Sequence, residues 1–272
     1  KKVGIYPLCT PWDLTSLNKL EHYGMEAYKV ASADLTNIEL LHALSKIGKP
    51  LICSTGMSTE AEIKQTIQFL QKHSVQFALM HCNSTYPSPY KDINLKYMMK
   101  LKELSKTIVG YSGHERGFSI PIAAVALGAK IIEKHFTVDR SLEGIDHKVS
   151  LLPQEFKDMV KKIREVEHAL GESIPRRISQ GEMINRENLA KSLAIDRPLK
   201  KGQVIHRDMI QVKSPGQGIQ PNRMEDLVGK KAIRDFSPGD YFYESDISPG
   251  AVKKKNYQFS RPYGIPVRYH DF

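Results

Sequence analysis

Two short apolar segments, Ile108-Val109-Gly110-Tyr111-Ser112 and Ile131-Ile132-Glu133-Lys134, decide how this chain folds. Each is followed closely by a histidine, His114 after the first and His135 after the second. Residues 118–128, between them, are small and apolar and long enough for one helix. The pattern therefore predicts a strand, a helix and a second, parallel strand. Because the carboxyl ends of parallel strands meet at one edge of a sheet, we expect the two imidazoles to lie close together.

Two neighbouring imidazoles on rigid strands suit a divalent metal ion when one or two oxygens complete its shell. Asp146 and His147 follow later in the chain and are candidates to supply or orient such oxygens. A histidine at the end of a strand is equally compatible with an ordinary hydrogen bond to a nearby loop. The spacing alone leaves both interpretations open, and the rest of the chain favours the metal.

The same alternation of strand and helix runs through the first 170 residues. Further strands are predicted at residues 3–10, 27–31, 50–54 and 77–82, and further helices at residues 13–23, 35–47, 59–73, 94–104 and 153–170. Thr59 and Glu62 form a capping box at the start of one of these helices. Six βα units fall short of the eight that close a (β/α)8 TIM barrel. Because the chain opens almost directly into a strand, we expect a barrel without its first two βα units, with an open six-stranded sheet as the alternative.

The composition changes near Gly171, which indicates a second domain. Residues 1–172 are predicted to form most of the barrel domain, and the polar residues 173–190 a linker. Residues 191–249 are predicted to form a small β-rich domain with tight turns. Residues 250–272 are predicted to form a tail or a linker to a further domain.

Composition and charge narrow the class of protein. No apolar run is long enough to span a bilayer, and no signal peptide is recognised at the start, which favours a cytoplasmic protein without a membrane partner. Cys9, Cys53 and Cys82 lie in apolar runs, which predicts reduced, buried thiols.

The net charge of the chain is +10, and much of it lies in the C-terminal third. From Arg176 onward there are 18 basic and 11 acidic residues. These charges are scattered without interleaved aromatic residues, so they favour an anionic substrate or a solvated surface over nucleic acid.

Polar residues stand at all the predicted strand ends: Thr10, Lys29, Ser32, Asp34, Ser54, Thr55, Ser84, Tyr86, Ser112, His114, His135 and Thr137. Each has an ordinary explanation when taken alone, such as a structural ion pair for Lys29. In a barrel, however, they would converge on the C-terminal mouth, where such enzymes keep their sites. One lysine, several hydroxyls and glycine-flanked amides suit a phosphate dianion. Asp34 and Asp146 suit sugar hydroxyls or proton transfer.

Together these motifs resemble the sialic acid synthase family, whose members condense phosphoenolpyruvate with an N-acylated hexosamine. The resemblance covers roughly residues 4–247 and rests on six ordered motifs, which are far more specific together than any one alone. They are Ala27-Tyr28-Lys29-Val30-Ala31-Ser32-Ala33-Asp34, Ser54-Thr55-Gly56-Met57, His81-Cys82-Asn83-Ser84-Thr85-Tyr86-Pro87, Gly110-Tyr111-Ser112-Gly113-His114, Glu133-Lys134-His135-Phe136-Thr137 and Gly144-Ile145-Asp146-His147.

The resemblance implies a TIM barrel followed by an antifreeze-like (SAF) domain, in a domain-swapped homodimer. His114 and His135 would hold a divalent metal, Mn²⁺ first, with Mg²⁺ or Co²⁺ as alternatives. Phosphoenolpyruvate would be bound by Lys29, Ser54, Ser84 and Ser112, with Thr10, Ser32 and Tyr86 around it. Asp34, where the family often has Glu, would contact the amino sugar. Asp146 would hold the sugar or a metal-bound water.

Two departures from the family's pattern matter. The first two βα units, with a glutamate and a lysine of the site, have no counterpart in this sequence, and if the complete polypeptide also lacks them we expect no activity. The SAF loop usually reads Arg-Pro-Gly, but Ser214 replaces its arginine here, with Lys213 or Arg223 as possible substitutes. The alternatives are another phosphoenolpyruvate-dependent synthase, such as the deoxyoctulosonate-phosphate type, an aldolase, or a non-catalytic module that keeps the fold.

Overall fold

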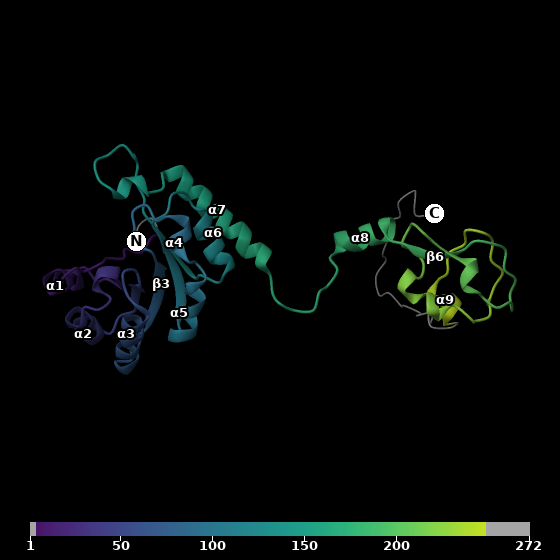
Figure 1. Ribbon diagram of the computed structural model, residues 1–272, viewed down its shortest axis with the longest axis horizontal. Helices are drawn as coiled ribbons and strands as arrows, with labels where there is room; N and C mark the ends of the chain where they lie inside the picture. The colour runs from purple at the N-terminus through teal and green to yellow at the C-terminus, as the bar shows by residue number, and fades with distance from the viewer. Residues whose placement is uncertain (1–3, 249–272) are drawn as a thin grey trace, which may run out of the picture. The chain divides into compact units, whose positions relative to one another are not determined.

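The structure of the protein is a computed structural model that describes residues 4–248. The chain divides into two compact units, Lys1–Ser173 and Ile174–Phe272, and each is considered by itself (Figure 1). The predicted tail at residues 250–272 lies outside the described residues.

Five parallel strands form the sheet of the first unit, in the order of the chain. They are β1 (Tyr28–Val30), β2 (Leu51–Ser54), β3 (Phe77–Cys82), β4 (Ile108–Gly113) and β5 (Ile131–Lys134). Each coincides with a predicted strand. Strands β4 and β5, each followed closely by a histidine, are neighbours in the sheet, as predicted.

The prediction of a sixth strand at residues 3–10 is wrong. This segment makes a single bridge, between Cys9 and Tyr28. Gly4 has a positive φ, and Pro7 lacks the N–H that a ladder needs, so the segment does not pair along its length. Cys9 is consequently exposed, which corrects the prediction of three buried thiols, whereas Cys53 and Cys82 are buried.

The sheet is curled into a half-barrel. Lys29 lies on β1 and Glu133 on β5, at the two edges of the sheet, yet Lys29 Nζ is 3.0 Å from a carboxylate oxygen of Glu133. In a flat sheet four strand spacings would separate these edges by about 19 Å. The curvature therefore brings the inner-face side chains of the first and last strands into contact.

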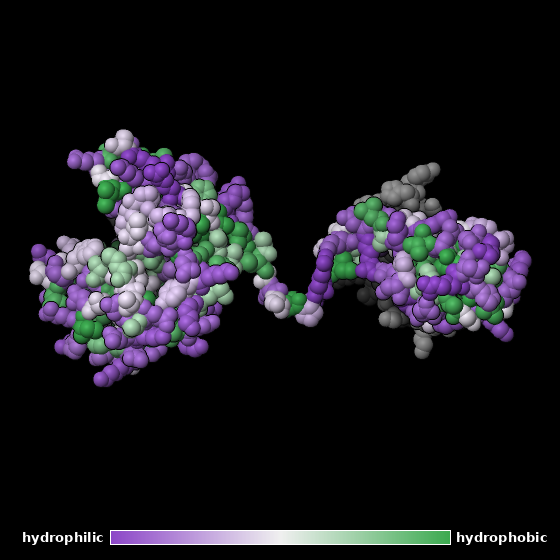
Figure 2. Space-filling model, in the orientation of Figure 1, coloured by the Kyte–Doolittle hydropathy of each residue, from purple (hydrophilic) through white to green (hydrophobic). Residues whose placement is uncertain are grey.

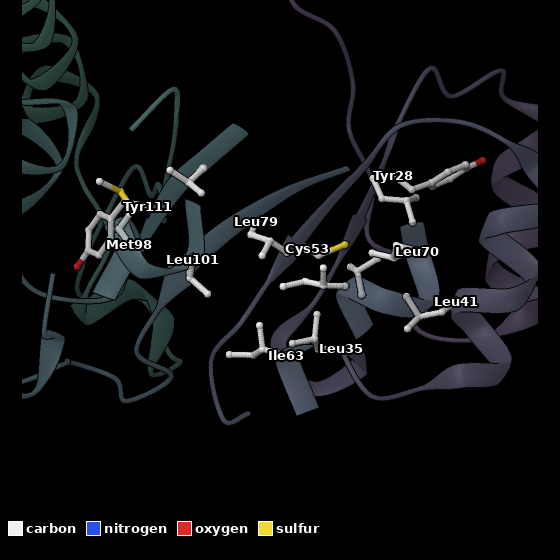
Figure 3. Packing of buried hydrophobic residues seen from close by; sticks show 14 of the residues in the cluster. Tyr28, Leu35, Leu41, Cys53, Ile63, Leu70, Leu79, Met98, Leu101 and Tyr111 are labelled. Carbon is white, nitrogen blue, oxygen red and sulfur yellow. The ribbon is translucent and has the colours of Figure 1, made fainter. Parts of the chain in front are cut away.

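Helices connect the strands and cover the outer face of the sheet (Figure 1). They are α1 (Leu14–His22), α2 (Ile38–Ile47), α3 (Glu60–Lys72), α4 (Tyr90–Ile93), α5 (Tyr97–Ser105), α6 (Ser119–Ala126) and α7 (Pro153–Leu170), with 3-10 turns η1 (Ser32–Asp34) and η2 (Asp146–Lys148). The predicted capping box of α3 is present, since Thr59 and Glu62 each bind the other's backbone N–H. The core packs outer-face strand residues such as Leu79 against helix residues such as Ile63 and Leu101 (Figure 3).

The second unit has its own small core. Strands β6 (Ser192–Ile195) and β7 (Ile210–Lys213) pair antiparallel, and isolated bridges, the 3-10 turns η3 (Arg207–Met209) and η4 (Pro221–Asp226), and helix α9 (Glu244–Ile247) complete it. Leu193, Phe236 and Phe242 are among its buried residues. The predicted linker contains a helix, α8 (Gln180–Leu189), which Ser179 and Glu182 cap reciprocally. That Ser-x-x-Glu spacing is the sequence signal for the helix.

The surfaces of both units mix residue types. Figure 2 shows hydrophilic residues over most of the visible face of each unit, with hydrophobic residues in scattered patches. Among the described residues, no helix is long and apolar enough to cross a membrane.

Candidate active site

The strand register gathers polar side chains on the inner face of the half-barrel, near the carboxyl ends of the strands. Cys82 pairs with Ser112, and Ser112 pairs with Glu133. Paired residues in parallel strands point to the same face, and every second residue along a strand shares that face. By the same register, Lys29 and Ser54 belong to this inner face. The sheet therefore brings side chains of five separate sequence motifs onto one surface, which we call the polar floor. It consists of Lys29, Ser54, Cys82, Ser112 and Glu133, with Ser32 and Ser84 just beyond the ends of their strands.

Lys29 is the positively charged residue of the polar floor, and the sequence did not predict the residue with which it forms an ion pair. The Lys29 ammonium is 3.0 and 3.2 Å from the two carboxylate oxygens of Glu133. Glu133 lies two residues before His135, so strand alternation puts both on one face. That alternation was the signal that would have placed Glu133 in the site.

Three side chains with hydroxyl or thiol groups cluster around Gly56. The Gly56 N–H donates to Ser32 Oγ at 3.2 Å, and Cys82 Sγ lies 3.7 Å from the hydroxyls of both Ser32 and Ser84. A Cβ at position 56 would lie only 2.2 Å from Ser84 Oγ and 2.8 Å from Ser32 Oγ. Glycine therefore allows this close approach. Cys82, predicted only as a packing residue, is part of the cluster.

Two buried polar atoms of the predicted site have no hydrogen-bond partner among the described residues. They are Asp34 Oδ2 and Ser54 Oγ. The other carboxylate oxygen of Asp34 accepts a hydrogen bond from Asn37 Nδ2 at 3.0 Å. An unsatisfied buried polar group costs about 1–3 kcal/mol, so such groups are typical of sites that bind a polar ligand.

His114 and His135 lie together, as predicted from the two strands. Their ring centroids are 5.2 Å apart, and the Tyr86 ring lies 4.2 Å from His114 and 5.7 Å from His135. Burial lowers the pKa of both imidazoles; the neighbouring His114 lowers that of His135 further, while Asp146 opposes the shift. Both rings are therefore neutral near pH 7.

The donor set fits a divalent metal ion whose remaining ligands are oxygens. His114 Nδ1 is 2.8 Å from the carbonyl oxygen of Asn83. Donation of the Nδ1–H to that carbonyl would leave Nε2 free to bind a metal ion, a common arrangement for metal-binding histidines. In the described part of the chain, no three His, Cys, Asp or Glu side chains are gathered closely enough to form a complete metal site. Water or substrate oxygens would complete the shell around the two imidazoles.

The remaining predicted site residues lie around this floor. Asp146 begins η2, with an oxygen 3.8 Å from His135 Nδ1, and its side chain is 61% exposed. The adjacent His147 is held by Thr137, since its Nδ1 is 2.8 Å from Thr137 Oγ1. Thr10 directly follows the bridging Cys9 and is half-buried. Among the described residues, no hydrogen bond joins Thr10 to the other site residues.

The second unit carries the loop in which Ser214 replaces the family's arginine. Lys191 Nζ donates to Ser214 Oγ at 2.7 Å, so an ammonium lies beside this position. Arg223, one of the two suggested substitutes, forms ion pairs with Asp226 and Glu244. Lys191 is therefore a cation at this loop that sequence reasoning missed.

Comparison with known proteins agrees with this arrangement. A sequence profile of the NeuB family matches residues 1–175, and one of the SAF domain matches residues 190–248. The chain belongs to the NeuB family. The predicted family is thereby confirmed.

Several of its relatives are synthases. The N,N'-diacetyllegionaminic acid synthase of Campylobacter jejuni is 39% identical over 247 residues, covering 90% of this chain and 74% of that protein. The human N-acetylneuraminate-9-phosphate synthase is 34% identical, covering 94% and 72%. A crystal structure of the N-acetylneuraminic acid synthetase of Leptospira borgpetersenii in complex with citrate is 39% identical, with a TM-score of 0.64 and coverage of 69% and 67%. The prediction of a synthase-type enzyme agrees with these relatives.

Proposed function

We propose that this protein condenses phosphoenolpyruvate with an N-acyl hexosamine to give a nonulosonic acid and phosphate. The observation that carries the proposal is the polar floor of the half-barrel. A lysine and four serine hydroxyls, of which the buried Ser54 Oγ has no partner among the described residues, lie on the side of the sheet that carries the paired neutral histidines. The names of the relatives support the same chemistry, because they make acids of this class.

The floor supplies what a phosphate dianion needs. The Lys29 ammonium provides charge, and hydroxyls of Ser32, Ser54, Ser84 and Ser112 provide donors in a partly buried setting. Fixed donors replace the water that solvates the free dianion, without reorganising during the reaction. Because Glu133 keeps Lys29 on the inner face, the ammonium is held in position before the substrate arrives.

His114 and His135 would hold the divalent ion, Mn²⁺ first, with Mg²⁺ or Co²⁺ as alternatives. When bound, that ion supplies Lewis-acid polarisation of the sugar aldehyde. The methylene carbon of phosphoenolpyruvate then attacks the aldehyde carbon, water adds to the cationic enol carbon, and the tetrahedral adduct expels phosphate. Asp34 and Asp146 would hold sugar hydroxyls or accept the proton of the water. The floor would hold the two reacting carbons in contact distance and orientation.

The decisive experiment measures phosphate release from phosphoenolpyruvate in the presence of Mn²⁺ and N-acetylmannosamine or related amino sugars. We expect phosphate release that requires both sugar and metal. It should disappear in His114→Ala and persist in His22→Ala, a control at an exposed histidine outside the site. Release with phosphorylated, non-acylated sugars would favour the deoxyoctulosonate-phosphate type of synthase. No release from the complete polypeptide, folded and metal-loaded, with any sugar would contradict the proposal.

The identity of the amino sugar is a finer part of the proposal. The relatives named above make different acids, and the SAF loop of this chain carries Ser214 with Lys191 beside it. We expect Ser214→Arg to change the ranking of N-acyl sugars in a substrate panel, because it adds a guanidinium at this loop. An unchanged ranking would exclude a role for this position in selectivity.

We extend the proposal to the architecture. The curvature of the five-stranded sheet supports its being the larger part of an eight-stranded barrel, and the SAF domain supports a domain-swapped homodimer of the family's type. Light scattering of the purified protein should give about twice its 30.8 kDa mass. A monomer at micromolar concentration would contradict the dimer, and a crystal structure with both sheet edges open to solvent would contradict the barrel.

A further inference from the structure

A buried ion pair lies behind the two histidines, and the proposed chemistry does not use it. Lys134 Nζ is 2.9 Å from Glu115 Oε1, and both side chains are 0% exposed. Lys134 also donates to the backbone carbonyl oxygen of Glu115. The other carboxylate oxygen of Glu115 accepts a hydrogen bond of 2.6 Å from the Tyr111 hydroxyl. The carboxylate and the ammonium are thus hydrogen-bonded to each other and to other groups of the protein.

The backbone is shaped to admit this pair. Gly113 on β4 pairs with Lys134 on β5. A Cβ at Gly113 would lie 2.8 Å from both carboxylate oxygens of Glu115 and 2.8 Å from the Tyr111 ring. The Glu115 carboxylate therefore packs directly against the Gly113 backbone, and any larger residue there would displace it.

The pair sits next to both candidate metal ligands in the chain. Glu115 directly follows His114, and Lys134 directly precedes His135. Consecutive residues of a strand point to opposite faces, so Lys134 projects outward where its neighbours Glu133 and His135 project inward. The salt bridge therefore joins the end of β4 to the end of β5 at the point where the two imidazoles leave the strands.

A gain in folding stability is by itself a weak explanation for a buried ion pair of this kind. Removing two charges from water costs several kcal/mol per ion, and apolar side chains of similar volume often stabilise a buried site as well or better. Charged hydrogen bonds do supply direction and short, defined distances, which apolar contacts do not. Two bonds from one ammonium, to the carboxylate and to the carbonyl of Glu115, restrict both the separation and the rotation of the strand ends.

We propose that the Lys134–Glu115 pair is a positioning element that holds His114 and His135 at the separation required for a divalent ion. The inference rests on the metal site of the proposed function. Lys134 and Glu115 touch no substrate and act through the two histidines. Tyr111 binds the same carboxylate, but it lies on β4 only four residues before Glu115 and does not join β4 to β5. Its hydroxyl therefore provides a matched control.

The test compares Mn²⁺ binding by calorimetry in the full chain and three variants. Lys134→Met with Glu115→Gln removes the salt bridge without leaving an unpaired charge, and Lys134→Met alone is the second variant. Each should bind Mn²⁺ about 10–100-fold more weakly, as expected when partners behind metal ligands are lost. Tyr111→Phe should stay within about threefold of the unchanged protein. The visible absorption spectrum of bound Co²⁺ should change in the two bridge variants and not in Tyr111→Phe.

Circular dichroism at the binding temperature identifies the variants that are folded, and Mn²⁺ affinities are compared only among these. Unchanged affinity in the double variant or in Lys134→Met would overturn the inference while leaving the metal site intact. An equal loss in Tyr111→Phe would also overturn it, because general loosening of the core would then explain the effect. Failure of the unchanged protein to bind Mn²⁺ or Co²⁺ would overturn both the inference and the metal part of the proposed function.

Discussion

At the scale of single residues, Gly56 is the tightest point of the candidate site. We expect Gly56→Ala to lower kcat/KM by about 100-fold, since its Cβ would push the hydroxyls of Ser84 and Ser32 from their places, and a displacement of 1 Å costs about that much. The overall fold should persist, because the clash involves short polar side chains at the surface of the site. Steady-state kinetics measure the effect. Gly181→Ala is the matched control, since a Cβ there meets nothing within 4 Å.

If Gly56→Ala retained the kinetics of the unchanged protein, the hydroxyl cluster would not take part in substrate binding. A loss that appeared only as a lower yield of folded protein would assign Gly56 a structural role instead.

His81 gives a prediction of pH dependence at a residue outside the site. Burial lowers the pKa of His81 below its usual value of 6.5, and its Nε2 lies 2.6 Å from the carbonyl oxygen of Ile93. The unfolded chain therefore binds more protons in mild acid, so the contribution of His81 to stability is complete above pH 6.5 and is lost as the pH falls toward the lowered pKa. The variant His81→Gln keeps a side-chain N–H that can donate to the Ile93 carbonyl oxygen, and it removes the titratable imidazole.

Urea unfolding at several pH values between about 7 and 5 measures this effect. The free energy of unfolding should fall less steeply with acidity in His81→Gln, by at most about 1.4 kcal/mol per pH unit. His22→Gln, at an exposed position, controls for the loss of an imidazole. Parallel pH profiles for His81→Gln and the unchanged protein would show that His81 is not the group responsible.

At the scale of elements, the capping box of α3 connects a local signal to the core. Thr59 and Glu62 satisfy backbone N–H groups at the start of the helix, whose residues Ile63, Ile67 and Leu70 pack into the main cluster. Thr59→Ala should lower the free energy of unfolding of the first unit by about 1 kcal/mol. Ser45→Ala removes an exposed hydroxyl from the surface of α2, where it binds a carbonyl of the same helix, and should change stability little. Chemical denaturation of both variants checks the difference, and equal effects would count against the cap.

At the scale of the whole molecule, each unit contains its own hydrophobic core. Leu79 is fully buried in the first, and Phe242 in the second, where it packs 4.9 Å from the Phe236 ring. Leu79→Ala and Phe242→Ala should each remove about 3 kcal/mol from the stability of their own unit, through lost burial and a residual cavity. Differential scanning calorimetry should show each substitution lowering a different transition. A common shift of both transitions by either substitution would show that the units unfold together.

Much of the architecture follows from local patterns. Short apolar runs mark all five strands, because a buried parallel strand needs little more than a continuous apolar segment. Thr59 and Glu62 mark a helix start for the same local reason. Ser179 and Glu182 carry the same capping-box signal, but the polar composition around Pro175 led to the prediction of a linker there. The segment at residues 3–10 failed as a strand because apolar residues alone do not supply the N–H groups that a ladder requires.

The sequence by itself determined the family, the order of strands and helices, and the pairing of the two histidines, since strand exits in parallel βα units share one edge. Only the tertiary structure decided which side chains meet. Glu133 reaches Lys29 because the sheet curls, and Lys134 reaches Glu115 because neighbouring strands are in register. These contacts join residues that are 104 and 19 positions apart. Curvature and register arise from the packing of all the strands and helices together, so no short stretch of sequence contains them.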